Sequence, residues 1–385
     1  MKSQLWSLDP SITYLNHGSF GACPRAVLEK QSMLRQRIEH NPHHFFKREF
    51  EGLLDAARIE VAKFLGGTPE NLVFVPNATT GVNTVLRSLQ FQPGDELLTT
   101  SQEYNASRNA LNFVADRAGV KVVVADIPFP IASTDQMIAA ILGQLSPKTK
   151  LALLDHVASQ TSLIFPMQQL VSLLAERGVD VLVDGAHAPG MIPLNLAEMG
   201  AAYYTGNCHK WLCAPKGAAF LYIRPDRHAS IRPLTISHGA NSPRRDRSRL
   251  HLEFDWTGTP DPTAYLCIPV SIQWLAECLP GGWPALMAHN HDLALTARHT
   301  LCQTLKIQPP SPAAMVGSMA SIPLPHDLPA DLPQLLYERF KIEAPIIPWP
   351  DAHHRLLRIS AQLYNTEADY EKLATALGSL WAKSI

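Results

Sequence analysis

Short apolar runs that end in polar residues and lead into helical segments recur along the first half of the chain. We expect strands at 72–75, 96–100, 120–125, 151–157 and 181–184. Helices are expected at about 82–89, 107–118, 133–145 and 167–177. A strand followed by a crossover helix returns to a parallel neighbour, so this order predicts an α/β fold whose mostly parallel sheet has helices on both faces.

Polar side chains follow these predicted strands at the points where the strands end. They are Thr79, Thr80, Tyr104, Ser159, Asp184, His187 and, further on, Lys210. Ligands of open α/β sheets bind outside the carboxyl ends of the strands, so these groups are expected at one site. A carboxylate that faces a protonated ring nitrogen and a lysine that forms a Schiff base are what pyridoxal phosphate requires.

Two features near this edge have a cofactor-binding and a purely structural interpretation. The turn 76–81 exposes small and hydroxyl residues before a helix, which suits a phosphate. Thr79 or Thr80 could instead simply cap that helix. Tyr104 could stack on a flat heterocycle or be an ordinary surface tyrosine.

Length and composition predict a globular protein with a large and a small domain. The chain has 385 residues, of which 46% are hydrophobic and 17% charged. We expect an N-terminal segment at 1–22, a cofactor-binding domain at 23–265, and a C-terminal domain of long linking helices and an α+β unit at 266–385. The net charge is −1, and nucleic acid is not an expected partner.

Two sequence blocks keep alternative interpretations open. The arginine-rich run 244–249 is better explained as a solvated loop than as a polyanion site. The block 41–49, rich in histidine, aromatic and basic residues, is either a corner between helices or a loop that faces the substrate.

The cysteines and the apolar segments bear on the compartment. Six cysteines show no CxxC pair, which predicts free thiols in a reducing compartment and no structural metal site. The first 20 residues lack the apolar core of a signal peptide, and no run of about 18 apolar residues is present. We therefore expect a cytoplasmic protein with no membrane partner.

Four sequence blocks resemble the class V aminotransferase-like, fold-type I pyridoxal phosphate enzymes. They are NATTGVN (77–83), VDGAHAPG (183–190), TGNCHKW (205–211) and RISAQLYNT (358–366). The blocks LNHGSFGACP and NPHHFFKRE look most like the isopenicillin N epimerase-like branch. That branch also contains C–S lyases of cysteine conjugates, so the resemblance leaves the substrate open.

The resemblance implies a role for individual residues. Lys210 would hold the cofactor as a Schiff base and then act as the acid/base on the external aldimine of an amino-acid substrate. Asp184 would keep the pyridine nitrogen protonated, and Tyr104 would stack on the ring. The phenolic oxygen would lie near His187 and Ser159. The phosphate would be held by Ala78 (through its backbone), Thr79, Thr80, Asn207 and His209, and by Thr259 of a second subunit, which implies a homodimer with shared sites.

The substrate side of the site is implied in the same way. Arg358 would pair with the substrate α-carboxylate in a bidentate manner, and Asn16 and His17 would lie nearby. Epimerisation is the first expectation, with Lys210 serving one face of the carbanion and Tyr104, His17 or a water the other.

Other reactions and a non-catalytic role are the alternatives. A C–S lyase that releases a keto acid and an aminotransferase remain open. A sulfur-carrying desulfurase is disfavoured, because the stretch 341–357 before Arg358 has no cysteine. A non-catalytic protein on the same fold would predict a damaged Lys210 or Asp184, and both are intact.

Overall fold

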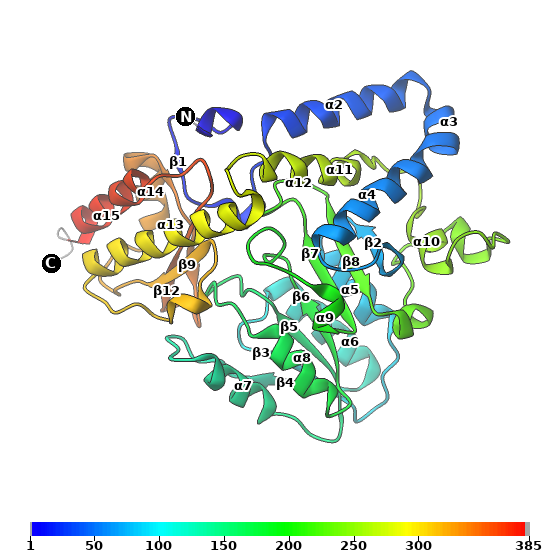
Figure 1. Ribbon diagram of the computed structural model, residues 1–385. Coiled ribbons are helices and arrows are strands. Elements are labelled where there is room, and N and C mark those ends of the chain that lie inside the picture. Colours follow the sequence, from blue (N-terminus) through cyan, green and yellow to red (C-terminus); the bar gives the residue numbers. More distant parts are fainter. Residues whose placement is uncertain (1, 382–385) are drawn as a thin grey trace.

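A seven-stranded sheet forms the centre of the larger part of the molecule (Figure 1). The computed structural model describes residues 2–381. In spatial order the strands are β2 (Leu72–Val75), β8 (Ala219–Ile223), β7 (Tyr203–Asn207), β6 (Asp180–Asp184), β5 (Thr149–Asp155), β3 (Glu96–Thr100) and β4 (Lys121–Ala125). β8 is antiparallel to both of its neighbours, and the other pairs are parallel. The predicted α/β fold with a mostly parallel sheet is therefore confirmed.

Both faces of this sheet are buried. Along β5, Leu151 and Leu153 point into one hydrophobic core, while Ala152 and Leu154 point into the other. Such two-sided burial requires continuous apolar runs rather than an alternation with polar residues. One core includes side chains of α5 (Ala78–Ser88), α6 (Asn105–Ala118) and α10 (Arg249–Phe254). The other includes side chains of α2 (Arg25–His40), α4 (Phe50–Phe64), α7 (Thr134–Leu142) and α8 (Met167–Ala175).

Short elements and loops connect these helices and strands. The block 41–49 forms α3 (Pro42–His44) and a π-helical turn, η2 (Phe45–Glu49), between α2 and α4. The remaining short elements of the larger part are α1 (His17–Phe20), α9 (Leu196–Met199), α11 (Thr263–Leu266), α12 (Ile268–Ala276), and the turns η1 (Lys2–Leu5), η3 (Pro69–Asn71), η4 (Pro225–Ser230) and η5 (His238–Asn241).

Two local expectations differ from the structure. The helix expected from residue 82 begins at Ala78, because the Asn77 side chain caps it by accepting from the Thr80 N–H at 2.8 Å. β7 was not among the expected strands. Its sequence YYTGN is short and ends in polar residues, and pairing on both sides makes it a buried strand.

A smaller part packs beside the first and carries about the last quarter of the chain (Figure 1). Its antiparallel sheet has the order β11 (Ile346–Pro348), β12 (Arg355–Ser360), β9 (Met319–Pro323). The helices α13 (Gly282–Thr304), α14 (Leu332–Phe340) and α15 (Glu367–Trp381) contribute to its core, and η6 (Ala313–Met315) precedes β9. The N-terminal strand β1 (Thr13–Tyr14) pairs with β10 (Ile342–Glu343), so the N-terminal segment is joined to the smaller part here.

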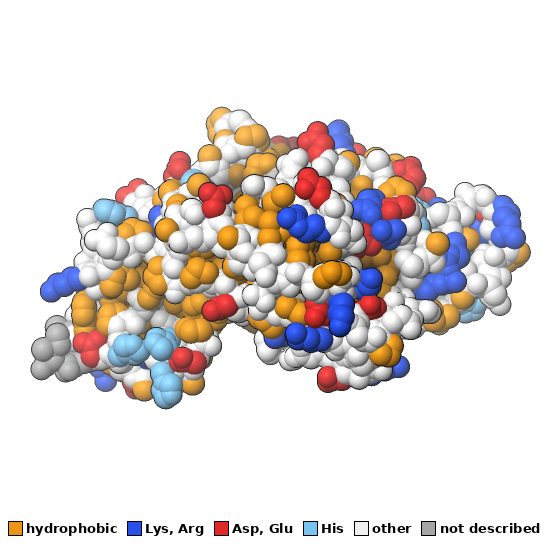
Figure 2. Space-filling model, turned by 90° about the horizontal axis from the view of Figure 1, so that it is seen from below, with side chains coloured by type: hydrophobic (Ala, Val, Ile, Leu, Met, Phe, Trp, Pro, Cys, Tyr) orange, Lys and Arg blue, Asp and Glu red, His pale blue; other side chains and the backbone are white. Residues whose placement is uncertain are grey.

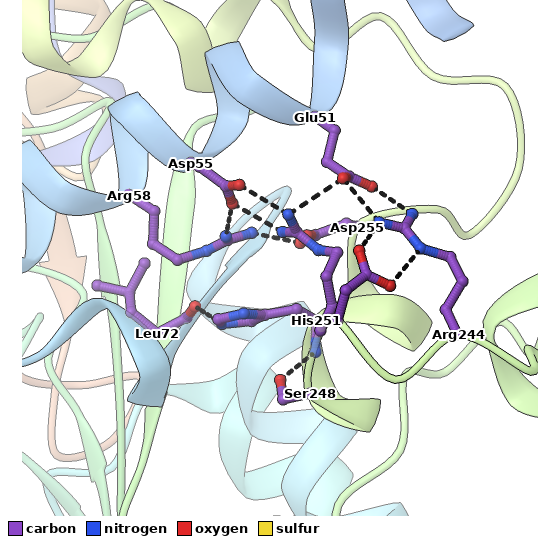
Figure 3. A network of polar contacts seen from close by, with 10 residues as sticks. Glu51, Asp55, Arg58, Leu72, Arg244, Ser248, His251 and Asp255 are labelled. Carbon is purple, nitrogen blue, oxygen red and sulfur yellow. Dashed lines mark hydrogen bonds and ion pairs between the residues drawn. The ribbon is translucent and has the colours of Figure 1, made fainter. Parts of the chain in front are cut away.

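An ion-pair network joins α4 to the arginine-rich run before α10 (Figure 3). Arg58, whose side chain is 2% exposed, pairs with Asp55 and Asp255. Arg247 pairs with the same two carboxylates, at 2.7 and 2.9 Å. Arg244 is paired with Glu51 at 2.7 Å. Arg244 and Arg247 are thus neutralised by nearby carboxylates, which supports the structural interpretation of the run.

The surface shown in Figure 2 carries acidic and basic side chains side by side, with histidines gathered at the end formed by the smaller part. In the smaller part, His326 and His354 are in ring contact, with centroids 5.1 Å apart. Within residues 2–381 no helix combines the length and apolar character needed to cross a membrane.

Candidate active site

Asp184 and Lys210 lie at the same edge of the seven-stranded sheet. Asp184 ends β6, which pairs with β7, and Lys210 follows β7. Asp184 is 2% exposed and accepts from the Ser107 hydroxyl at 2.7 Å and from the Ala186 N–H at 3.1 Å. Burial raises the pKa of Asp184, and these two donors and the Lys210 charge oppose the rise. A cation placed against this carboxylate would keep it ionised.

The Lys210 amine is buried beside His187. Its Nζ lies 3.0 Å from His187 Nε2. Burial, and then the charge of Arg358, lower the pKa of Lys210 to about 7. Burial and the Lys210 charge hold the pKa of His187 well below its usual range, so the ring is neutral. With Nε2 accepting from the amine, Nδ1 carries the proton, and Nδ1 has no hydrogen-bond partner within the described chain.

The start of α5 converges on the residues that follow β7. The Ala78 N–H donates to Asn207 Oδ1 at 2.8 Å. Helix and strand approach so closely that a Cβ on Gly81 would lie 2.1 Å from Thr205 Oγ1. His209 Nδ1 donates to the Ala218 carbonyl at 3.0 Å, which leaves Nε2 for a ligand. Burial lowers the pKa of His209 to about 4, and the charge of a phosphate would favour its protonated form.

Arg358 comes from β12 of the smaller part and reaches into the larger one. It is 4% exposed, and its Nη1 donates to the Ser159 carbonyl at 2.7 Å and hydroxyl at 3.2 Å. Its Nη2 donates to the Ser19 hydroxyl at 2.7 Å, and Ser19 in turn donates to Asn16 Oδ1 at 2.5 Å. Arg358 Nε is buried and lacks a partner among the described residues. Burial lowers the pKa of Arg358 to about 10, so it stays charged at neutral pH.

The His17 side chain is fully buried and contacts the backbone of Lys210. Its Nε2 donates to the Lys210 carbonyl at 3.0 Å, which can only accept, and its Nδ1 accepts from the Tyr364 hydroxyl at 2.8 Å. Burial lowers the pKa of His17 to about 3, consistent with this neutral tautomer. Both ring nitrogens are therefore engaged.

The remaining predicted residues are less closely gathered. Tyr104 precedes α6 and is 43% exposed. Thr79 lies in the first turn of α5, whereas the Thr80 hydroxyl donates to Asn77 Oδ1 at 3.0 Å and so belongs to the helix cap. Thr259 is exposed on the loop before α11. Its expected contact is with a second subunit and stays a prediction.

Three polar groups of the site were not among the predicted residues. Ser107 donates to Asp184, Ser19 donates to Asn16 and accepts from Arg358, and Asp155 lies opposite Asp184 in the register of β5 and β6. The sequence held a signal for Asp155, because it ends a buried strand as Asp184 does. Ser19 is 339 residues from Arg358, and no local pattern links the two.

The site fits pyridoxal phosphate on observations of its own. A buried carboxylate, a lysine whose pKa is lowered to about 7, an unpartnered His187 Nδ1–H and a helix start beside Asn207 match the ring nitrogen, aldehyde, phenolic oxygen and phosphate of that cofactor. Fold and site together define a fold-type I, pyridoxal-phosphate-dependent enzyme.

Comparison with known proteins agrees with this class. The model of the aminotransferase class-V family matches residues 13–373, and the chain belongs to this family. It is 36% identical to an isopenicillin N epimerase of Amycolatopsis lactamdurans, over 97% of this chain and 96% of that protein. It is 27% identical to an L-cysteine desulfhydrase of Arabidopsis thaliana, over 96% of this chain and 88% of that protein.

Solved structures show the same fold. A cystine C–S lyase, in complex with its product cysteine persulfide, superposes with a TM-score of 0.82 at 22% identity, covering 96% of this chain and 98% of that one. The cysteine desulfurase CsdA of Escherichia coli gives a TM-score of 0.81 at 20% identity, over 100% of this chain and 98% of that one. One variant of the lyase carries glycine covalently linked to its pyridoxal phosphate cofactor.

Proposed function

We propose that the protein is an amino-acid epimerase that removes the substrate α-proton and returns it on the opposite face. The observation that carries the proposal is the Lys210 amine, which is buried, has its pKa lowered to about 7, and lies close enough to Arg358 for that charge to act on it. Such an amine is a base at neutral pH, within reach of a substrate whose carboxylate the arginine holds. The 36% identity to an epimerase over nearly the whole chain supports the same reaction.

The cofactor, when bound, supplies an electron sink for the carbanion that forms at Cα. The chain's own groups do the rest. Asp184, in its ionised form, would keep the ring nitrogen protonated, the His187 Nδ1–H would donate to the phenolic oxygen, and Lys210 Nζ takes the α-proton from one face. The start of α5, with Asn207 and His209, would hold the phosphate.

One edge of the Arg358 guanidinium is suited to binding the substrate carboxylate. Nε and Nη2 of a guanidinium lie on one side and bind a carboxylate through two parallel hydrogen bonds. Nε is unpartnered in the described structure, and Nη2 is held by the Ser19 hydroxyl. In our proposal the carboxylate replaces Ser19 at Nη2, while Ser159 keeps the other side of Arg358 fixed.

The second face of the carbanion needs its own proton carrier. His17 has both ring nitrogens engaged, which disfavours it for proton transfer. Tyr104 is partly exposed, and its phenol is near enough for its charge to act on the pKa of Arg358. We assign the second proton to the Tyr104 hydroxyl. A C–S lyase does not need this second carrier.

The cysteines give no support to a sulfur-accepting reaction. Burial raises the pKa of Cys213, and it lies against His17 with Sγ 3.7 Å from Nε2. Burial likewise raises the pKa of Cys23 to about 12. Thiols of this kind are poor nucleophiles. Loss of a cysteine side chain as sulfide is the competing activity, because a relative is a desulfhydrase.

One experiment separates these reactions. Purified protein with pyridoxal phosphate is incubated in heavy water with L-amino acids, including L-cysteine, and analysed for chirality, deuterium at Cα and keto acid. We expect D-product that carries deuterium and no keto acid. Sulfide and pyruvate from L-cysteine without racemisation of any substrate would refute the epimerase proposal.

Tyr104→Phe provides the internal control for the two-face scheme. We expect this variant to exchange the α-proton of the L-substrate with solvent through Lys210 but to form little D-product. Equal losses of exchange and of racemisation would show that Tyr104 does not serve the second face.

The proposal also includes a homodimer in which Thr259 of the partner subunit reaches the phosphate. Light scattering tests the dimer, and weaker cofactor retention in Thr259→Ala tests the contact.

A further inference from the structure

Two more carboxyl groups lie beside Asp184, and the proposed reaction uses neither. One oxygen from each of Glu103, Asp155 and Asp184 lies within 4.8 Å of the others. Glu103 follows β3, whereas Asp155 and Asp184 end the adjacent strands β5 and β6. All three are buried, with exposed fractions of 5%, 2% and 2%. The adjacency of β3, β5 and β6 therefore creates a compact carboxyl cluster.

The surroundings offer little compensation for three negative charges. The charges that act on Glu103 are those of Asp155 and Asp184. Those that act on Asp155 are Asp184 and Lys210, and the pKa of this lysine is itself lowered to about 7. The Thr99 hydroxyl of β3 donates a hydrogen bond to Glu103 Oε2 at 3.4 Å. The Ser107 hydroxyl of α6 donates to Asp184 and not to Glu103 or Asp155. Nearby His156 is neutral, because burial lowers its pKa to about 4. Glu103 Oε1 and Asp155 Oδ2 are buried and lack partners in the described chain.

We propose that Glu103 and Asp155 form a proton-holding carboxyl pair, which leaves Asp184 as the ionised member of the cluster facing the cofactor ring nitrogen. Protons are the simplest compensation for carboxylates this close together, as in other buried acid pairs. Burial and mutual repulsion raise the pKa of both groups well above their ordinary values, in agreement with the geometry. The inference rests on the Asp184 role proposed above but not on which Cα bond reacts.

The pair would act on the cofactor through Asp184, so both are positioning residues. A neutral pair lets Asp184 keep its charge, and any loss of a proton from the pair adds negative charge near the ring nitrogen. Either state favours a protonated ring. The Tyr104 backbone N–H also faces both carboxyls and lowers the pKa of each, so the pair lies against the residue expected to stack on the ring.

Infrared spectroscopy of the full-length protein with bound cofactor tests the protons directly. A protonated carboxyl has a carbonyl stretch separate from that of a carboxylate. At neutral pH we expect this signal in the wild type and its reduction in Glu103→Gln and in Asp155→Asn. Spectra that are the same in all three proteins would overturn the proposal. Either variant alone suffices if the other does not fold.

Thermal unfolding gives a second readout, with and without cofactor. A carboxyl whose folded pKa is raised keeps its proton while the unfolded chain releases it, so stability falls as pH rises above the ordinary pKa of 4.5 for Glu103. The amide in Glu103→Gln does not titrate, so this variant does not lose stability in this way as pH rises. We expect the melting temperature of Glu103→Gln, relative to wild type, to rise by on the order of a few degrees between about pH 5 and pH 8.

Two comparisons complete this design. Asp55→Asn is the control, because Arg247 lowers the pKa of Asp55 and the contribution of this carboxylate is complete above its ordinary value of 3.8; the melting temperature of this variant relative to wild type should therefore not change between about pH 5 and pH 8. A shift in Glu103→Gln that does not vary with pH would mean a purely structural role and overturn the proposal. So would stabilisation of the wild type, but not the variant, by added Mg²⁺ or Ca²⁺, since the cluster would then be a cation site. These results stand whether the enzyme epimerises or eliminates.

Discussion

Gly21 allows the N-terminal segment to pack directly against the backbone of Lys210, and its replacement by alanine is a sharp test of that contact. Gly21 has φ of 69°, a region that side chains disfavour. A Cβ at this position would lie 2.1 Å from the His209 carbonyl oxygen and 2.9 Å from Lys210 Cα. The atoms in the way are backbone, so no side-chain rotation relieves the contact.

The expected cost has two contributions. With ψ at 160°, this backbone conformation is essentially confined to glycine and costs a residue with a Cβ about 1–3 kcal/mol. Overpacking in a buried site adds roughly 1–3 kcal/mol. Gly21→Ala should therefore lower the free energy of unfolding by about 2–6 kcal/mol in total. Because the displaced atoms belong to His209 and Lys210, we also expect weaker cofactor binding and a lower racemisation rate.

Gly178→Ala is the matched control. Gly178 has a nearly equal φ of 71°, but no atom lies within 4 Å of a Cβ placed there. Its cost should be the conformational contribution alone, about 1–2 kcal/mol, with unchanged cofactor affinity. Denaturant unfolding and titration with pyridoxal phosphate measure both quantities. If both variants lose the same stability and bind cofactor equally well, the argument from contact with Lys210 is wrong.

Three further predictions follow from single groups. Lys210 loses its proton near pH 7, so the rate at which the protein takes up pyridoxal phosphate should rise up to about pH 7 and then level off; a midpoint near the ordinary value of 10.5 would contradict this. Arg358→Lys cannot form the paired hydrogen bonds to a carboxylate, so steady-state kinetics should show KM raised roughly 10- to 100-fold, with a smaller effect on kcat. Arg58→Met should lower the free energy of unfolding by about 3 kcal/mol, because Asp55 and Asp255 lose a buried partner. Lys121→Met is the control for this variant, because the exposed Lys121 side chain lies 3.9 Å from Glu96. It should lower the free energy of unfolding by less than about 1 kcal/mol in the same denaturant assay.

Sequence periodicity was sufficient for most of the sheet, because its strands are buried on both faces and are separated by helices. β5 and β6 are apolar runs that end in an acid, and this pattern predicted both the strands and the position of Asp184. The strand that the sequence indicates at 217–223 forms β8, but its direction could not be predicted, since a strand after an irregular loop pairs either way. β9 and β11 were missed for a related reason, as short strands beside prolines depend on pairing with β12 for their conformation.

The residues proposed to face the cofactor could be picked out from the sequence. The contacts that set their pKa values and tautomers could not. Asp184, His187 and Lys210 lie in one short stretch, whose sequence order follows the edge of the sheet. The carboxyl cluster depends on β3 lying next to β5, so Glu103 meets Asp155 only after the sheet has formed. Side-chain tautomers are equally non-local. The state of His17 follows from a carbonyl 193 residues away and a phenol 347 residues away.

The N-terminal segment contacts both Arg358 and the backbone of Lys210. Ser19 accepts a hydrogen bond from Arg358, whereas His17 and Gly21 touch the backbone of Lys210. Gly18, between them, donates its N–H to Ser360 of β12 at 3.0 Å. A substrate carboxylate that displaces Ser19 would therefore disturb the same short segment that supports Lys210. The segment joins the two parts of the molecule at the site itself, so its sequence is constrained from both sides, by the arginine proposed to bind the substrate carboxylate and by the lysine proposed to move the proton.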